Sequence, residues 1–147
     1  MTLANQNIEI LKNLRTLIIG LNREQYETKN PHITHRSIGS MVHEIVQYHQ
    51  NLITGIYHNY IQYDAKNIDL STFNNMDIAA KALDNIMLAL QSISEDKKLA
   101  ISGLNREKNN EMSSTLTREL AFNYDHTLQL ISIIRLSLGN ERRAAMA

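Results

Sequence analysis

Two histidines and a glutamate lie close together in the stretch SIGSMVHEIVQYHQNLITG, residues 37–55. Imidazole nitrogens and carboxylate oxygens bind divalent metals, so His43, Glu44 and His49 are the first candidates for a chemical site. Apolar residues recur here at three- and four-residue steps, which predicts an amphipathic helix. On a helical wheel of about 100° per residue, His49 falls within the apolar stripe, while His43 and Glu44 fall on opposite borders of the polar face. These side chains cannot converge on one ion, and His49 is predicted to be a neutral core histidine with one hydrogen bond.

A different row of residues does share one side of this helix. Met41, Glu44 and Tyr48 are spaced i, i+3 and i+7, so they face a neighbouring helix together. The last helical pattern of the chain carries a second row with a common face, which consists of Glu119, Asn123, His126 and Leu130. We expect the two rows to form a ligand pocket between these helices.

Two interpretations of these rows stay open. In the first, Glu44 bonds to His126 or to a neighbouring amide, and the buried polar pair fixes how the helices pack. In the second, Glu44 and His126 bind zinc, nickel or manganese, with Glu119 or Asn123 as a third group. We expect no cofactor, and Glu44 and His126 are the candidate ligands if a metal binds. Ser113 and Ser114 are interpreted as helix caps rather than nucleophiles.

Four helical patterns must position these side chains. Apolar residues at helical spacing predict helices over residues 5–21, 37–57, 77–93 and 114–138. Asn5 and Ser37 are the expected N-caps, and Gly139 is expected to end the last helix in the left-handed conformation. Asn22 and Gln25 have the spacing of a capping box, which predicts one further helical turn.

The connections differ in length and character. Residues 57–77 lose the helical period and gather Asn, Asp, Ser and Thr, which predicts a long connection. Residues 95–112 are charged and broken by glycine, and their segment KLAIS is a candidate strand without a hairpin partner. The predicted fold is therefore all-α, a single domain over residues 1–147, with four bundled helices and a long crossover connection between the second and the third.

Composition narrows the chemistry and the partners. The 147 residues include no cysteine, which excludes disulfides, thiolate nucleophiles and cysteine-based zinc sites. Lys and Arg balance Asp and Glu at 15 each, so we expect neither nucleic acid nor an anionic membrane as a partner. No segment approaches the roughly 20 apolar residues that span a bilayer, and no leader pattern precedes the first helix. We expect a cytoplasmic protein.

Three segments carry a resemblance to a known family. They are SIGSMVHEIVQYHQNLITG, IQYDAKN and SSTLTRELAFNYDHTLQLISII. In their order and spacing they resemble the DinB-like superfamily (DinB/YfiT-type) of four-helix bundles, and the likeness covers residues 24–138. Such proteins have a long crossover between the second and third helices, and many are homodimers. Several branches bind a divalent metal through one histidine of helix two and two of helix four, and characterised relatives include metal-dependent thiol transferases.

The metal triad that the resemblance implies is degenerate in this chain. The family's helix-two histidines fall on Met41, Glu44 and Tyr48, and none of these is a histidine. On the last helix His126 matches the first ligand, whereas the second falls on Leu130. One imidazole and one carboxylate stay in register, while a catalytic zinc normally has three protein ligands.

Two functions are therefore carried forward, and whether the chain is an enzyme stays open. The first is a DinB-like protein that binds a small ligand or acts as a dimeric, non-catalytic bundle. The alternative is a metal-dependent small-molecule transferase, acting on thiols, or a hydrolase, with Glu44, Glu119 and His126 as its working residues. A homodimer is predicted because the helices carry surplus apolar residues. These residues are Leu14, Leu17, Ile18, Ile19, Leu21, Leu128, Ile133 and Leu136.

Overall fold

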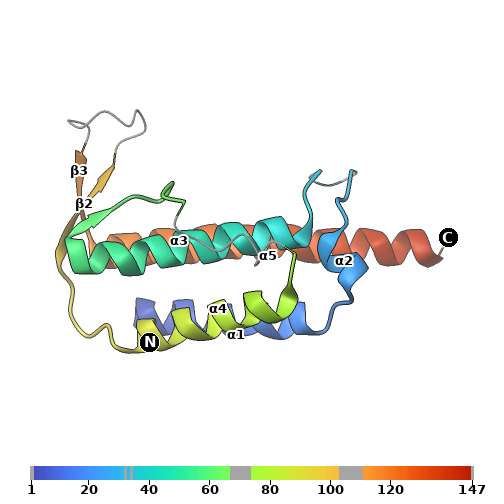
Figure 1. Ribbon diagram of the computed structural model, residues 1–147, viewed down its shortest axis with the longest axis horizontal. Coiled ribbons are helices and arrows are strands. Elements are labelled where there is room, and N and C mark those ends of the chain that lie inside the picture. The colour runs from blue at the N-terminus through green and yellow to red at the C-terminus, as the bar shows by residue number, and fades with distance from the viewer. Residues whose placement is uncertain (1, 32, 34, 67–73, 103–110, 147) are drawn as a thin grey trace.

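The computed structural model describes residues 2–31, 33, 35–66, 74–102 and 111–146 (Figure 1). These residues form helices α1 (Leu3–Ile19), α2 (Arg23–Glu27), α3 (Ile38–His58), α4 (Met76–Gln91) and α5 (Leu116–Met146). They also form strands β1 (Tyr60–Ile61), β2 (Lys98–Ser102) and β3 (Glu111–Thr115). The fold is mostly helical, as predicted, and the small sheet is an addition to that prediction.

The four long helices lie in two layers, with α3 beside α5 and α1 beside α4 (Figure 1). Helix α1 packs against α4 and α5, and α3 packs against the same two helices. Helices α1 and α5 run in one direction, while α3 and α4 run in the other. Because α3 and α4 run the same way, the end of α3 and the start of α4 lie at opposite ends of the helices, which is compatible with the predicted long crossover (Figure 1).

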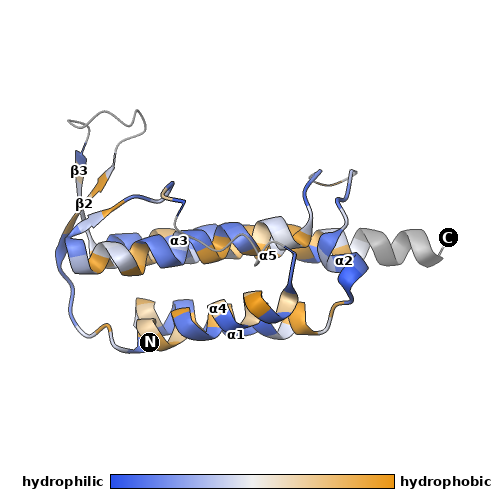
Figure 2. Cartoon of the chain, in the orientation of Figure 1, coloured by the Kyte–Doolittle hydropathy of each residue, from blue (hydrophilic) through white to orange (hydrophobic). Residues whose placement is uncertain are grey.

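The predicted apolar stripes supply the core. Figure 2 shows hydrophobic and hydrophilic residues interleaved along each long helix, which is the pattern of amphipathic helices that share a core. Fully buried side chains come from all four long helices and include Leu11, Leu14, Ile18, Ile45, Leu52, Leu83, Leu90 and Ile134. Within the described ranges, no helix combines the length and the apolarity that crossing a membrane requires.

Two of the predicted helix caps are confirmed. Ser37 caps α3, and Asn22 and Gln25 form the predicted capping box of α2. The predicted cap of α1 is wrong, because the helix begins earlier, at Leu3, and the Thr2 side chain accepts a hydrogen bond from the backbone N–H of Asn5.

The predicted stop at Gly139 is also wrong. Helix α5 continues through Gly139 to Met146, and no described glycine has a positive φ. A glycine ends a helix only when it takes the left-handed conformation. The segment NERRAAM after Gly139 is rich in strong helix formers, which favour continuation.

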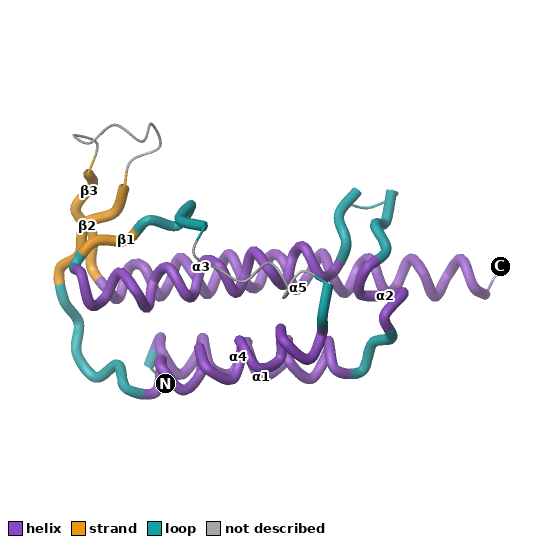
Figure 3. Tube along the Cα trace, in the orientation of Figure 1, coloured by secondary structure: helices purple, strands orange, loops and turns teal. Residues whose placement is uncertain are grey.

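The structure corrects the prediction for residues 95–115. The candidate strand KLAIS is β2, and it lies between β1, which is parallel to it, and β3, which is antiparallel (Figure 3). Ser113 and Ser114 belong to β3 and do not cap a helix. Thr115 is the cap of α5 instead, since its Oγ1 accepts a hydrogen bond from the backbone N–H of Arg118 at 3.1 Å.

A glycine in α3 allows the sheet to lie against the helix. A Cβ atom at Gly55 would collide with Cγ1 of Ile61 and would come within 2.9 Å of the carbonyl oxygen of Tyr60. Any side chain at this position would therefore displace β1. The close approach anchors the sheet at the end of the helices where α5 begins (Figure 3).

Candidate functional site

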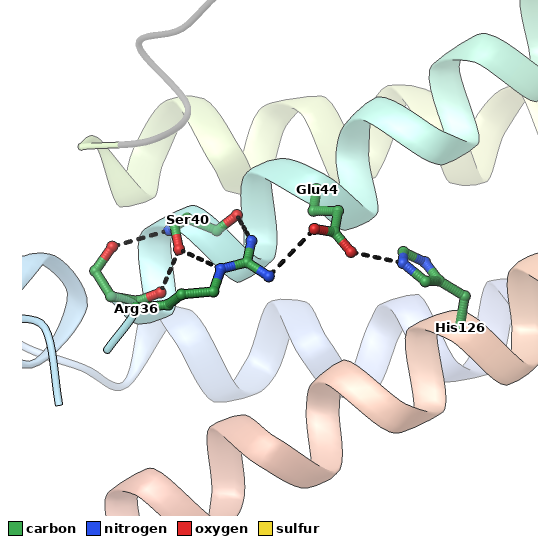
Figure 4. A network of polar contacts seen from close by, with 5 residues as sticks. Arg36, Ser40, Glu44 and His126 are labelled. Atoms are coloured by element: carbon green, nitrogen blue, oxygen red, sulfur yellow. Dashed lines mark hydrogen bonds and ion pairs between the residues drawn. The ribbon is translucent and has the colours of Figure 1, made fainter. Parts of the chain in front are cut away.

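A carboxylate and an imidazole join the two helices that the sequence singled out. Glu44 of α3 and His126 of α5 lie with Oε2 and Nε2 2.7 Å apart (Figure 4). The other oxygen of Glu44 lies 3.2 Å from Nη1 of Arg36. Arg36 is fixed in turn by Ser40, whose Oγ and carbonyl oxygen accept hydrogen bonds from Nε and Nη2, both at 3.1 Å. Glu44 is thus held between two nitrogen donors.

These contacts determine which atoms of Glu44 and His126 carry a proton. The hydrogen bond from His126 lowers the pKa of Glu44, and Arg36 adds to this effect, against burial, which raises the pKa. The ionised carboxylate can only accept, so Nε2 of His126 carries the proton. Nδ1 of His126 is buried and has no hydrogen-bond partner among the residues that the structure describes.

Four rings form an aromatic cluster beside this pair. The rings of Tyr48 and His126 are stacked, with centroids 4.1 Å apart and planes at 11°. Tyr63 stacks on Tyr48 at 5.3 Å, and Phe122 lies 5.4 Å from Tyr63. Phe122 is 45 % exposed. The cluster therefore joins α3, α5 and the segment after β1, and part of it faces solvent.

A second polar network surrounds Glu119, which is buried near the start of α5. Its two carboxylate oxygens accept hydrogen bonds from the hydroxyls of Tyr63, at 2.7 Å, and Ser114, at 2.5 Å. Nδ2 of Asn123 donates to the Tyr63 hydroxyl at 3.0 Å. Burial, followed by the hydrogen bond to Glu119, raises the pKa of Tyr63. Each oxygen of the Glu119 carboxylate is therefore engaged by a hydroxyl group of the protein.

The connection that carries Tyr63 is itself anchored to α3. Nδ2 of Asn51 donates to the carbonyl oxygens of Tyr63, at 2.9 Å, and Ala65, at 3.0 Å. Nε2 of Gln47 donates to the same Tyr63 oxygen at 3.3 Å. Tyr63 therefore takes part in the network around Glu119, in the contacts with Asn51 and Gln47, and in the aromatic cluster.

The predicted pocket residues fall into three groups. Glu44, Tyr48 and His126 meet, as their spacing predicted, and Glu119 and Asn123 lie in the adjoining network around Tyr63. The remaining two predicted pocket residues belong to the core, since Met41 is 1 % and Leu130 7 % exposed. Their apolar side chains pack in the core cluster.

Sequence reasoning missed several side chains of this site. They are Arg36, Tyr63, Ser114 and Phe122. Arg36 and Tyr63 lie in connections, where no helical period indicates direction. A signal for Arg36 was present, because it precedes the helix cap Ser37 directly and can fold back over the first turns of α3.

His49 lies in the core, as predicted, and belongs to a separate buried network. Its Nδ1 lies 3.0 Å from the carbonyl oxygen of Ile45 and its Nε2 lies 3.2 Å from Oδ1 of Asn7. The Asn7 amide nitrogen donates to the carbonyl oxygens of Leu3 and Leu120. Burial lowers the pKa of His49 to about 4. A neutral imidazole has one N–H, so only one of the two acceptors receives a hydrogen bond.

The donor set does not fit a metal of the expected kind. Glu44 and His126 are close enough to share an ion, but the other positions implied by the resemblance are filled by Met41, Tyr48 and Leu130. Across the described ranges, no group of three or more His, Asp or Glu side chains is placed to hold a metal ion.

Comparison of the chain with protein-family models, with curated proteins and with solved structures finds no match. The DinB-like resemblance therefore stays a prediction that rests on the sequence motifs.

Proposed function

We propose that this chain is a DinB-like bundle that works without a metal and binds a small planar molecule at the aromatic cluster of Tyr48, Tyr63, Phe122 and His126. The observation that carries the proposal is the state of His126. Its Nε2 is bonded to Glu44 at 2.7 Å, and its ring is covered by Tyr48. The imidazole that the resemblance implies as a ligand is thus engaged by the protein itself.

The surroundings of the cluster favour a planar ligand. Phe122 presents a partly exposed ring that can stack on another ring. The charged groups of Glu44, next to His126, and of Arg36, next to Glu44, are partly exposed. Aromatic side chains together with a few fixed polar groups are the side chains that typically line small-molecule sites.

The metal-dependent transferase or hydrolase is the less favoured reading. It needs Glu44, Glu119 and His126 to converge, whereas Glu119 is bonded to Tyr63 and Ser114. Releasing Glu119 would leave the hydroxyl groups of the buried Ser114 and the partly buried Tyr63 without this acceptor, which costs free energy.

Metal analysis tests the first half of the proposal. Tag-free protein purified without chelator should contain no stoichiometric metal, and titration with zinc, nickel or manganese should show no micromolar binding. The His126→Ala variant should behave in the same way. Near-stoichiometric metal that is lost in His126→Ala would overturn the proposal in favour of the metal-dependent reading.

Ligand titration tests the second half. We would titrate the protein with p-hydroxybenzoate, benzamidine and indole, which are anionic, cationic and neutral planar probes, and follow the ring resonances of Tyr48 and Phe122 by NMR. At least one probe should shift these resonances and bind at least fivefold more weakly to Phe122→Ala. Leu88→Ala removes an exposed side chain on α4 and should leave probe binding unchanged. No shift with any probe at millimolar concentration would contradict small-molecule binding.

A homodimer is a second proposed property, and a specific surface supports it. Of the apolar residues that suggested it, Leu14 and Ile18 are buried in the core, whereas Ile19, Leu128 and Leu136 are exposed. Leu128 also lines a groove of about 230 Å³ between α1 and α5. We infer that α5 supplies the centre of the dimer interface.

A further inference from the structure

Strand β3 has a free edge. The strand order is β1-β2-β3, so β3 pairs with β2 on one side only. The backbone N–H of Leu116 donates to the carbonyl oxygen of Lys97 at 2.8 Å. In an antiparallel pair such bonded positions alternate with positions whose N–H and C=O point outward. Every second residue before Leu116 therefore bonds to β2, and these residues are Ser114 and Met112. The backbone N–H and C=O of Ser113, which lies between them, point away from β2.

A hydrogen bond on the other side of β2 confirms this alternation of inward and outward backbone groups. Ala100 is the register partner of Ser113, so its backbone groups should point away from β3. Its N–H does donate to the carbonyl oxygen of Asn59, on the β1 side, at 3.0 Å. No backbone group from the described part of the chain pairs with the outward groups of Ser113.

This edge lacks several of the features that normally protect an edge strand. Natural edges are blunted by proline, by lysine or by a bulge. The strand EMSST contains neither proline nor lysine, its one charged residue is Glu111 at its start, and its register with β2 is continuous from Glu111 to Thr115. The first three residues of β3 are exposed, and Met112 is 55 % exposed.

A basic concavity lies beside the edge. It has a volume of about 490 Å³ and is lined by Asn59, Lys98, Ala100, Ser113, Thr115 and Arg118, among others. Its charged lining residues, Lys98 and Arg118, are both basic. Ser113 belongs both to the concavity and to the free edge, so a strand added to β3 would place every second side chain over this concavity.

The strand is held in place before any partner arrives. The Ser114 hydroxyl is bonded to Glu119 at 2.5 Å, and Thr115 caps α5. A preformed edge costs little ordering free energy on binding.

We propose that β3 accepts an extended acidic segment of another protein by strand addition. The main chain of the segment bonds to Ser113, its acidic side chains lie over Lys98 and Arg118, and its apolar side chains lie beside Met112. A second copy of this chain fits less well, because symmetric pairing of two β3 edges would bring two basic concavities together. This site is independent of the aromatic cluster.

Three labelled peptides of about eight residues test the proposal by fluorescence anisotropy. The first alternates valine with glutamate, the second alternates valine with lysine, and the third is the glutamate peptide N-methylated at alternate backbone nitrogens. The glutamate peptide should bind, more weakly as salt is added, and the other two should bind at least tenfold more weakly. Equal binding of all three, or no binding of the glutamate peptide at millimolar concentration, would overturn the proposal.

Hydrogen exchange locates the contact without any variant. The amide of Ser113 should exchange quickly in the free protein and at least tenfold more slowly with the glutamate peptide, whereas the amide of Ser114, bonded to β2, should not change. An unchanged Ser113 amide in the presence of bound peptide would show that the peptide binds elsewhere, and the strand-addition proposal would be wrong.

Protein variants provide the matched controls. Ser113→Pro removes the outward N–H and should abolish peptide binding, while Ser113→Ala keeps it and should bind normally. Lys98→Glu combined with Arg118→Glu should reverse the preference from the glutamate to the lysine peptide. If sedimentation instead shows self-association of the wild type that Ser113→Pro removes, the occupant of the edge is a second copy and the acidic partner is excluded.

Discussion

His49 sits among the helices with a hydrogen-bond acceptor at each ring nitrogen, the Ile45 carbonyl and the Asn7 side-chain oxygen. Turning the Asn7 amide over would not help, because its nitrogen already donates to Leu3 and Leu120. Only an imidazolium could donate to both acceptors, but burial opposes the charge and His126 repels it. The ring therefore stays neutral in the folded state at the expense of one hydrogen bond.

This histidine should make the protein less stable in acid. Its pKa in the folded state is about 4, below the value of about 6.5 in an unfolded chain. Above pH 6.5 the ring is neutral in both states and contributes no pH dependence. Between pH 6.5 and 4 the unfolded state binds a proton that the folded state does not, so the free energy of unfolding should fall by about 3 kcal/mol.

Urea unfolding at several pH values between 4 and 7 measures this effect. His49→Gln should flatten the pH dependence over this window, because the titrating ring is gone. His58→Gln, which replaces an exposed histidine at the end of α3, should retain it. A wild-type profile that His49→Gln leaves unchanged would assign the acid sensitivity to other groups.

The Glu44–His126 pair should couple α3 to α5 measurably. A double-mutant cycle with Glu44→Ala and His126→Ala should give a coupling free energy of about 1 kcal/mol at pH 7, since the pair is partly buried and charge-assisted. The pKa of Glu44 is lowered by folding, so the coupling should vanish as pH falls through that pKa. The exposed pair of Glu9 and Lys12, 3.5 Å apart, is the control and should show no coupling. Equal values for the two pairs would argue against a structural role for Glu44.

At the scale of the elements, α5 offers the clearest test. Gly139 lies inside the helix, and a Cβ atom there would meet nothing within 4 Å. Gly139→Ala should therefore raise the free energy of unfolding by up to about 1 kcal/mol through helix propensity, with a gain in helical circular dichroism. A loss of stability in Gly139→Ala would instead indicate a left-handed glycine that ends the helix.

Helical periodicity explains why most of the bundle could be predicted from sequence. Buried apolar residues repeat with the helix, so the starts of all four long helices were predicted within two residues of the observed starts. The sheet was not predictable in this way. Ser113, Ser114 and Thr115 are typical of helix caps as well as of strands, and only the pairing of β3 with a distant β2 distinguishes the two.

Helical periodicity also explains which part of the site could be predicted from the sequence. Glu44, Tyr48 and His126 meet because regular helices fix the direction of each side chain. Tyr63 reaches Glu119 from a connection, and its position depends on Asn51, which holds its carbonyl oxygen. Such a contact is set by tertiary structure and leaves no periodic signal.

For the molecule as a whole, the exposed apolar residues of α5 predict self-association. Sedimentation at micromolar concentration should show a dimer. Leu128→Asp combined with Leu136→Asp should give a monomer, because two charges would be buried in the interface. Leu88→Asp, at a more exposed position on α4, should remain dimeric. A wild-type monomer at this concentration would exclude the dimer.

The direction of the helices also has a kinetic consequence. Bundles whose neighbouring helices are all antiparallel can assemble from short hairpins, each closing a small loop. Here α3 runs parallel to α4, and α1 runs parallel to α5, which lies near the other end of the chain (Figure 1). Much of the native contact area thus joins residues that are remote in sequence, which raises the contact order. Refolding should therefore be slower than that of an up-and-down bundle of equal length, because α1 is fully packed only once both α4 and the distant α5 are in place.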